Sequence, residues 1–280
     1  MIEIIPNAGE LDRYAELAEK NSLGFEYNDF FIPDLLDDRE ALKQRIALYK
    51  GLGRPEGIDT LHGAFFDIVP FSWDSGIRRH SLYRMQQSVE IACELGCRGV
   101  VFHTGIAHGL VSDGKYRANW LEVMEKTMRR LLAESGQVEI YCENVFDEKS
   151  PFELRDLAFA LRDEERFGVC LDVAHLMLSK EKPERWFREL APYVRHFHLN
   201  DNHLERDEHL ALGGGSIDWG FVFGLVRDNG LLGSSILLEM NGMEKIQKSL
   251  EFIEKYVGVS FKTEGRGYRN GYSADFGAGG

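Results

Sequence analysis

Short apolar runs alternate with amphipathic segments along almost the whole chain. The segments between the runs carry apolar residues every three or four positions, which is the spacing of one helix face. The sequence therefore predicts strands over residues 1–5, 24–27, 99–103, 138–143, 167–172, 194–199 and 235–239, and one more strand with its exit within 58–66. Helices are predicted over residues 11–21, 39–52, 77–95, 116–135, 183–190 and 244–256, and two more start at Ser150 and near Ile217.

Eight strand-then-helix units in succession are typical of one architecture. The strands are apolar on both faces, which indicates a parallel sheet covered by helices, and eight such units close into a barrel. We therefore predict a single-domain α/β fold, a (β/α)8 TIM barrel over residues 1–257, with a doubly wound open sheet as the alternative. The glycine-rich tail over 258–280 is expected to be loosely ordered or to fold over the barrel. Its candidate contacts to a substrate or a neighbouring subunit are Arg266, Tyr268 and Arg269.

Local signals predict where several elements begin and end. Gly96 and Gly136 follow predicted helices at the position of a C-terminal cap. In the segment 150–153 the serine is predicted as an N-cap, the proline as the first helical residue and the glutamate as the third. The acidic segment 34–38 is predicted to be a loop.

The charge balance limits the classes of partner. The chain has 280 residues, of which 44% are hydrophobic, and a net charge of −13. This charge argues against sequence-independent attraction to nucleic acid or to an anionic membrane, although bound cations would offset a cluster of carboxylates. There is no apolar run long enough to span a membrane, and the N-terminal segment is too polar for a secretory signal. We therefore expect a cytoplasmic protein without membrane contact, of unspecified oligomeric state.

The four cysteines carry no metal-site signature. They stand at positions 93, 97, 142 and 170, and none has the paired CxxC spacing of a structural zinc site. Reduced and mostly buried thiols are the expected state.

Polar residues of metal-ligand type stand at the ends of most predicted strands. In a (β/α)8 barrel the C-terminal strand ends meet at one mouth, where the chemistry takes place. Gathering so many acids and histidines there would cost too much desolvation unless bound cations neutralise them. The strand-end candidates are His62, His103, Glu143, Asp172, His198 and Glu239, and His175 follows three residues after the aspartate.

The loop after the strand 194–199 carries further candidates. Asp207 and His209 lie two residues apart, so both could reach one ion from an extended loop, and the glycine run 213–215 follows them. The alternative is a polar surface loop with solvated histidines. Alternation along the strand places His196 one layer deeper than His198. The histidines at positions 80, 108 and 203 fit the pattern less well.

The motifs around these residues resemble endonuclease IV, the AP endonuclease family 2, within the xylose-isomerase-like TIM-barrel superfamily. They spread over residues 61–239, which is most of the barrel. GVCLDVAH, followed by HFHLND and then DEHLALGGGSI, is the most specific series, while CEN and ILLE are weak alone. LHGAFF and VVFHTG carry the two remaining histidines.

The resemblance implies three metal ions, Zn²⁺ in that family, held by nine ligands. His62 and His103 would hold one ion with Glu143 as a bridge to the second, and the third would be bound by His175, Asp207 and His209. The second ion would be completed by Asp172, His198 and Glu239. Members of the family cleave the phosphodiester on the 5′ side of abasic sites in DNA, so the resemblance implies phosphoester hydrolysis of abasic DNA or of a smaller phosphorylated substrate. Glu143 would also help to orient the attacking water.

A metal-dependent sugar isomerase or epimerase remains the alternative. The second-ion set resembles the single-metal site of those enzymes, which would take Mn²⁺ or Mg²⁺ and use Glu143 and Glu239 to shuttle a proton beside a carbonyl. The segment 26–38, where the repair enzymes carry DNA-binding groups, is acidic and apolar here. Phe65 and Phe66 stand where the family inserts a wedge into the duplex, and packing or a stacking wall for a sugar is the competing role. A non-catalytic, metal-stabilised binding protein is the third possibility.

Overall fold

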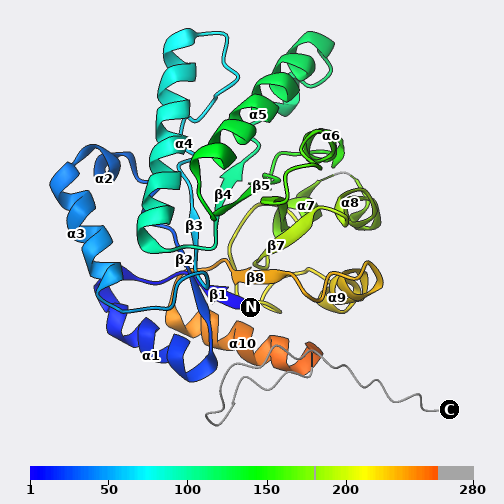
Figure 1. The fold of residues 1–280 in the computed structure, drawn as a ribbon. Coiled ribbons are helices and arrows are strands. Elements are labelled where there is room, and N and C mark those ends of the chain that lie inside the picture. Colours follow the sequence, from blue (N-terminus) through cyan, green and yellow to red (C-terminus); the bar gives the residue numbers. More distant parts are fainter. Residues whose placement is uncertain (180, 258–280) are drawn as a thin grey trace.

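The structure is a computed structural model that describes residues 1–179 and 181–257. Eight parallel strands form a closed barrel in which each strand pairs with the next in sequence, and β1 also pairs with β8. This closure confirms the predicted single-domain (β/α)8 barrel and excludes the open sheet (Figure 1). The strands are β1 (Ile2–Ile4), β2 (Gly24–Tyr27), β3 (Thr60–His62), β4 (Gly99–His103), β5 (Glu139–Glu143), β6 (Phe167–Asp172), β7 (Val194–Leu199) and β8 (Ser235–Leu238). The predictions for the tail 258–280 lie outside the described residues.

Helices surround the barrel on its outer face (Figure 1). They are α1 (Leu11–Asn21), α2 (Pro33–Asp37), α3 (Arg39–Lys50), α4 (Ser75–Leu95), α5 (Gly114–Glu134), α6 (Phe152–Ala160), α7 (Val173–Leu178), α8 (Pro183–Leu190), α9 (Trp219–Asp228) and α10 (Met243–Val257). Two 3-10 turns, η1 (Ala8–Glu10) and η2 (His108–Leu110), lie in the loops. Among the described residues there is no helix long and apolar enough to cross a membrane.

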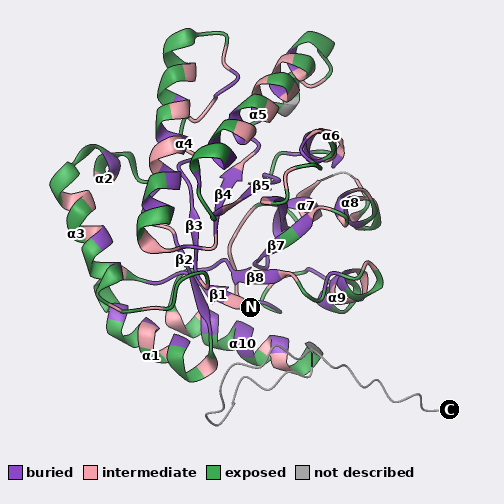
Figure 2. Cartoon of the chain, viewed as in Figure 1, coloured by how far each residue is buried: buried purple, intermediate pink, exposed green. Residues whose placement is uncertain are grey.

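Alternation along the strands divides the buried side chains between two cores. In β4, Val100 and Phe102 belong to the large apolar core between sheet and helices. Val101, between them, belongs to a separate cluster with Tyr141 and Cys170 inside the barrel. Because successive strand residues point to opposite faces, every second residue lines the barrel interior. Figure 2 shows the strands as the most completely buried part of the chain.

Aspartates cap the N-termini of five helices. Their side-chain oxygens accept hydrogen bonds from the first free backbone N–H groups, which have no partner within the helix. One of these caps, Asp172, is also a strand-end candidate for the metal centre. The capping residues are Asp38, Asp74, Asp113, Asp172 and Asp218, for α3, α4, α5, α7 and α9 respectively.

Several predicted boundaries are corrected. The expected loop 34–38 is wrong, because Pro33 starts the short helix α2 and Asp38 caps α3. The sixth helix begins at Phe152 rather than at Pro151, which occupies the cap position itself. The helix start expected near Ile217 is confirmed, because Asp218 caps α9, and the segment 58–66 contains the three-residue strand β3 as predicted. Gly96 does cap α4, with the left-handed backbone (φ 69°) that glycine tolerates.

The cysteines are free, as expected. Cys97, Cys142 and Cys170 are buried, and Cys93 is exposed at the end of α4.

Candidate metal centre

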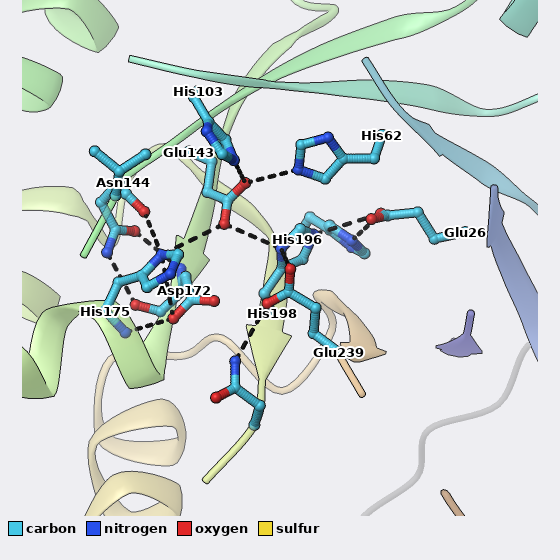
Figure 3. Close-up of polar contacts among 12 residues, drawn as sticks. Glu26, His62, His103, Glu143, Asn144, Asp172, His175, His196, His198 and Glu239 are labelled. Carbon is cyan, nitrogen blue, oxygen red and sulfur yellow. Dashed lines mark hydrogen bonds and ion pairs between the residues drawn. The ribbon is translucent and has the colours of Figure 1, made fainter. Parts of the chain in front are cut away.

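The strand-end acids and histidines converge at one mouth of the barrel (Figure 3). Within the barrel wall, His103 stands beside Glu143 and Asp172 stands beside His198 in the strand register. The interior alternation therefore places all of these side chains in the same layer, at the C-terminal ends of the strands. Figure 3 shows Glu143 at the centre of the group, with polar contacts to histidines on two sides.

The first predicted set is assembled around one oxygen of Glu143. Its Oε2 lies 3.4 Å from His62 Nε2 and 3.4 Å from His103 Nε2. The ligand-type atoms of the three residues all lie within 4.8 Å of one another. One small cation would therefore be within reach of all three after modest side-chain adjustment.

The second set uses the other oxygen of Glu143. His198 Nδ1 lies 3.1 Å from Glu143 Oε1 and 3.7 Å from Glu239 Oε1. Ligand-type atoms of these three residues and of Asp172 lie within 4.8 Å of one another, and all four residues are buried. Glu143 therefore belongs to both sets, and it would contact both cations if each set held one.

The capping role of Asp172 orients its carboxylate. Oδ1 accepts a hydrogen bond from His175 N at 2.6 Å, and Oδ2 remains buried without a hydrogen-bond partner. Asn144, the residue after Glu143, ties the two strand ends together. Its Oδ1 accepts from Asp172 N and its Nδ2 donates to the Asp172 carbonyl, both at 2.9 Å.

The third set comes from α7 and from the loop after β7, and it meets at Asp207. Its Oδ2 lies 2.8 Å from His209 Nε2 and 3.4 Å from His175 Nε2. His209 adopts a left-handed backbone (φ 47°), which is unfavourable for a residue with a side chain and costs about 1 kcal/mol. This conformation directs the imidazole back toward Asp207 and Glu239.

Asp201 folds the loop that carries the third set. It is fully buried, and its backbone pairs with Leu210 in both directions, which returns the loop to the mouth. Its carboxylate accepts hydrogen bonds from four N–H groups, three of the backbone and one of an indole, at residues 202, 213, 217 and 219. The last glycine of the run 213–215 allows this close approach, because a Cβ at Gly215 would lie 2.3 Å from the Asn202 carbonyl oxygen.

Replacement of Asp201 by alanine is expected to destabilise the protein by about 3 kcal/mol, because it leaves several buried N–H donors unpaired. Urea unfolding of the metal-free protein measures this loss. Asp218→Ala, which removes a single helix-cap bond to Phe221 N, is the matched control and should cost about 1 kcal/mol. Equal losses in the two variants would contradict the organising role of Asp201.

Electrostatics differ sharply between the two central carboxylates. Burial raises the pKa of Glu143, but the charges and hydrogen bonds of His198 and His103 outweigh this and hold the pKa well below its usual value. Burial raises the pKa of Asp172 well above its usual value, and the charges of Glu239 and Glu143 add to this against the opposing charge of His175. In the metal-free centre, neighbouring histidines therefore favour the ionised form of Glu143, whereas burial beside other carboxylates favours the protonated form of Asp172.

Unpaired buried atoms test whether the residues fit a bound metal. Among the described side chains, three of the nine candidate ligands have a buried polar atom without a hydrogen-bond partner at the mouth: Glu143 Oε2, Asp172 Oδ2 and Asp207 Oδ1. Buried polar atoms are rarely left unpaired, so a concentration of them at one mouth calls for a partner. Carboxylate and imidazole atoms at this spacing are the ligands of zinc and similar divalent ions, and the donor set fits such ions.

The comparisons with known proteins agree with the barrel. Residues 17–256 match the model of a family described as a xylose isomerase-like TIM barrel. The chain belongs to this family.

Relatives of this xylose isomerase-like barrel have different names. The structure of the TTHB071 protein from Thermus thermophilus, soaked with ZnCl2, is 26% identical, has a TM-score of 0.73, and covers 92% of this chain and 98% of that chain. A D-tagatose 3-epimerase-like protein has a TM-score of 0.72 over 92% of this chain and 97% of its own, and at 21% identity it shows the fold alone. A probable endonuclease 4 from Campylobacter concisus is 25% identical over 182 residues, which are 58% of this chain and 63% of that protein.

The two phenylalanines after β3 have different surroundings. Phe65 stacks on His103, with ring centroids 4.7 Å apart and an interplanar angle of 26°, and it also contacts His62. Phe66 is 52% exposed and packs beside Phe65 and Phe31. Phe65 therefore supports the first set of ligands, while Phe66 presents an aromatic face to solvent at the mouth.

Glu26 of β2 is a site residue that the strand-end pattern does not find. It is fully buried in the barrel interior, where its Oε2 lies 3.3 Å from His196 Nε2 and 3.4 Å from His198 Nε2. Burial raises the pKa of Glu26, but the charge of His198 and a hydrogen bond from His196 outweigh this and lower it. The sequence signal was a single acid within an otherwise apolar strand, GFEY.

The weaker histidine candidates lie elsewhere. His196 is buried one layer below the mouth and its Nδ1 lies 2.7 Å from Ser235 Oγ, in agreement with the deeper position expected from alternation. His80 is exposed on α4, and the exposed His203 pairs with Glu208. The side chain of His108 lies outside the described part of the chain.

Glu148 gives the loop after β5 a predicted pH response. Burial raises its pKa to about 8, although Thr104 Oγ1 and Val145 N both donate hydrogen bonds to its Oε1. Because folding raises the pKa of Glu148, its contribution to the free energy of unfolding is complete below pH 4.5, the pKa of the carboxyl in the unfolded chain. The contribution is lost as the pH rises through 8.

Glu148→Gln should therefore gain stability relative to the wild type by about 1 kcal/mol for each pH unit between pH 5 and pH 8. Urea unfolding at both pH values in the presence of a chelator measures the difference. Glu122→Gln, at an exposed position on α5, is the control and should show little change. If the free energy of unfolding differs between the wild type and Glu148→Gln by the same amount at pH 5 and pH 8, Glu148 is not a buried, protonated carboxyl in the folded protein.

Proposed function

We propose that the protein is a divalent-metal-dependent phosphoester hydrolase with a centre for three ions. The observation that carries this proposal is the third set. An isomerase or epimerase centre of one metal needs only the second set, Glu143, Asp172, His198 and Glu239. The convergence of His175, Asp207 and His209 on the same mouth, together with the first set, supports the proposal of two additional ions.

Three bound cations would supply Lewis acidity and an activated water for attack at phosphorus. The protein side chains would hold this arrangement in place. Glu143 fixes the separation of the first two sets, because each of its two oxygens faces a different set. Asn200 Nδ2 donates to Glu239 Oε2 at 3.2 Å and thereby orients the second carboxylate of the centre. Phe65 covers the two histidines of the first set on one side and restricts the access of water there.

The charge distribution favours a small phosphorylated substrate over abasic duplex DNA. The net charge is −13, and the segment 33–38 after β2 exposes three aspartates rather than phosphate-binding cations. A duplex presents a continuous row of phosphates, which proteins grip with many basic and amide groups. A small phosphoester needs only the metal centre itself and an apolar wall, which the exposed Phe66 would provide.

Metal content and a substrate panel test the proposal together. Protein reconstituted with Zn²⁺ or Mn²⁺ should bind about three ions per chain by elemental analysis. It should hydrolyse bis(p-nitrophenyl) phosphate and p-nitrophenyl phosphate, and lose this activity on chelation. Nicking of an abasic duplex identifies the DNA version of the reaction. Three bound ions with no turnover of any phosphoester in the panel would reject hydrolysis.

A sugar epimerase is the second candidate, and one contact favours it. Both Glu143 and Glu239 approach His198 Nδ1, so two carboxylates would flank the second ion from different sides. One carboxylate of such a pair can remove a proton from the carbon beside a carbonyl group on one face of the substrate. The other carboxylate can return a proton on the opposite face. The epimerase hypothesis would replace the hydrolase proposal if the protein epimerised ketohexoses with about one essential ion per chain and exchanged the substrate proton with deuterium from the solvent.

A further inference from the structure

Three histidines of the metal centre are held by the backbone. In each of them the Nδ1–H donates to a carbonyl oxygen, and Nε2 is the nitrogen that faces a carboxylate of the centre. Because the backbone at these positions is fixed by the fold, the choice of nitrogen is also fixed. The bonds run from His62 to Gly63 O at 3.0 Å, from His175 to Asn144 O at 2.9 Å, and from His209 to Glu239 O at 2.8 Å.

His198 has the opposite orientation. Its Nδ1 faces Glu143 and Glu239, and its Nε2 points down into the barrel interior. Among the hydrogen bonds of residues 1–179 and 181–257, there is none from this Nε2, which is buried and unpaired, to a backbone carbonyl. A different group must therefore select the nitrogen that His198 offers to a cation.

Glu26 is placed to make that selection. Its Oε2 lies 3.4 Å from His198 Nε2, and the side chains of both residues are fully buried (Figure 3). Glu26 Oε1 is itself buried without a hydrogen-bond partner in the described structure. A small rotation of the carboxylate would align an oxygen with Nε2–H and satisfy the nitrogen.

The barrel interior holds Glu26 in position from below. Its Oε2 also accepts a hydrogen bond from Thr60 Oγ1 at 2.9 Å and lies 3.3 Å from His196 Nε2. His196 is in turn fixed by Ser235 at the start of β8. The carboxylate therefore belongs to a connected polar network inside the barrel, where most barrels of this type carry branched apolar residues.

We propose that Glu26 is a positioning residue of the metal centre, which accepts the Nε2–H of His198 and so presents Nδ1 to the cation of the second set. The inference rests on the metal centre of the proposed function and not on the reaction that the centre performs. It extends the centre from the nine mouth residues to the interior of the barrel.

Cys170 is the competing partner for the same nitrogen. Its Sγ lies in a group with nitrogens of His196 and His198, within 4.8 Å of one another. Burial raises the pKa of this thiol well above its usual value, so it remains neutral and is a weak acceptor compared with a carboxylate. Cys170→Ala should therefore leave the orientation of His198 unchanged.

Two measurements on the full chain test the proposal. Zn²⁺ titration against a competing chelator gives the affinity of each ion, and ¹⁵N spectra of labelled histidine report which nitrogen of His198 carries the proton. Glu26→Ala should weaken the most affected Zn²⁺ by about 10- to 100-fold and shift His198 toward a mixture of tautomers. Glu26→Gln keeps an oxygen acceptor and should stay within about tenfold of the wild type, with the Nε2-protonated form dominant.

Glu3→Gln is the matched control. Glu3 is a second fully buried glutamate of the barrel interior, which contacts Thr60 and Arg98 and lies beside Glu26 and His196. Because the contacts of Glu3 are to these residues and not to a ligand of the centre, Glu3→Gln should leave Zn²⁺ affinity within about threefold. If Glu26→Ala does not fold, as judged by circular dichroism, Glu26→Met fills a similar volume without an acceptor and takes its place.

The proposal is overturned if a folded alanine or methionine variant binds Zn²⁺ as tightly as the wild type with unchanged ¹⁵N shifts. It is also overturned if Glu3→Gln weakens binding as much as Glu26→Ala, or if Cys170→Ala alone shifts the tautomer. All of these results are independent of substrate. An absence of phosphoester turnover would therefore reject the proposed reaction while Zn²⁺ titration still decides the role of Glu26.

Discussion

Glu143→Ala should reduce the metal content from about three ions to no more than one per chain and lower phosphoester hydrolysis by at least about 10³-fold. The reason is that a single side chain serves both of the first two sets. Its Oε2 faces His62 and His103, and its Oε1 faces His198. Without Glu143 the first set keeps only its two histidines, and the second set loses one of its four ligands. Elemental analysis after gel filtration, combined with steady-state hydrolysis, measures both effects.

Glu139→Ala is the control for that change. Glu139 is on the same strand, four residues earlier, at the opposite end of the barrel, where it accepts a hydrogen bond from Tyr141 at 3.0 Å. The control should keep its full metal content and activity within about threefold of the wild type, since distant sites act independently. A Glu143→Ala protein that still holds three ions would show that the sets are not bridged by this residue.

His209→Ala separates the two candidate reactions. The variant should lose the third ion and about 10³-fold of any phosphoester hydrolysis, because that reaction uses the complete centre. An epimerase that works with the second set alone should retain activity within about tenfold, because no ligand of that set is removed. Metal stoichiometry and both assays on one protein preparation give the comparison.

His203→Ala is a control in the same loop. Its imidazole is exposed and pairs with Glu208 rather than with Asp207, so it should retain three ions and full activity. If His209→Ala hydrolyses phosphoesters at the wild-type rate, the assignment of His209 to a catalytically required third ion is wrong.

Strand-end positions explain why so much of the centre could be predicted from the sequence. In a parallel barrel the residue that ends an apolar strand lies at the C-terminal mouth, whatever the conformation of the loops. His103, Glu143 and Asp172 each end such a strand, and the structure gathers all three. The residue after Glu143 is equally tied to the strand end, and Asn144 joins β5 to β6.

Contacts between distant segments could not be predicted in the same way. Asp207 meets His175 across 32 residues of sequence, and that meeting depends on the loop fold that Asp201 imposes. Glu26 and His198 are separated in sequence by most of the chain, and neither the strand periodicity nor their spacing in the sequence predicts that they meet. The helix over Pro33–Asp37 was missed because a short acidic stretch has weak helical preference of its own.

The sequence by itself determined the barrel, through strand and helix periodicity, and the polar character of its mouth, through the residues that end the strands. Only the tertiary structure decided which oxygen or nitrogen of each side chain faces which neighbour. Periodicity constrains the direction of a side chain to one face of an element. The atom that it offers to a cation depends on hydrogen-bond partners, such as Gly63 O for His62 and Glu26 for His198, which reach it only in the closed barrel.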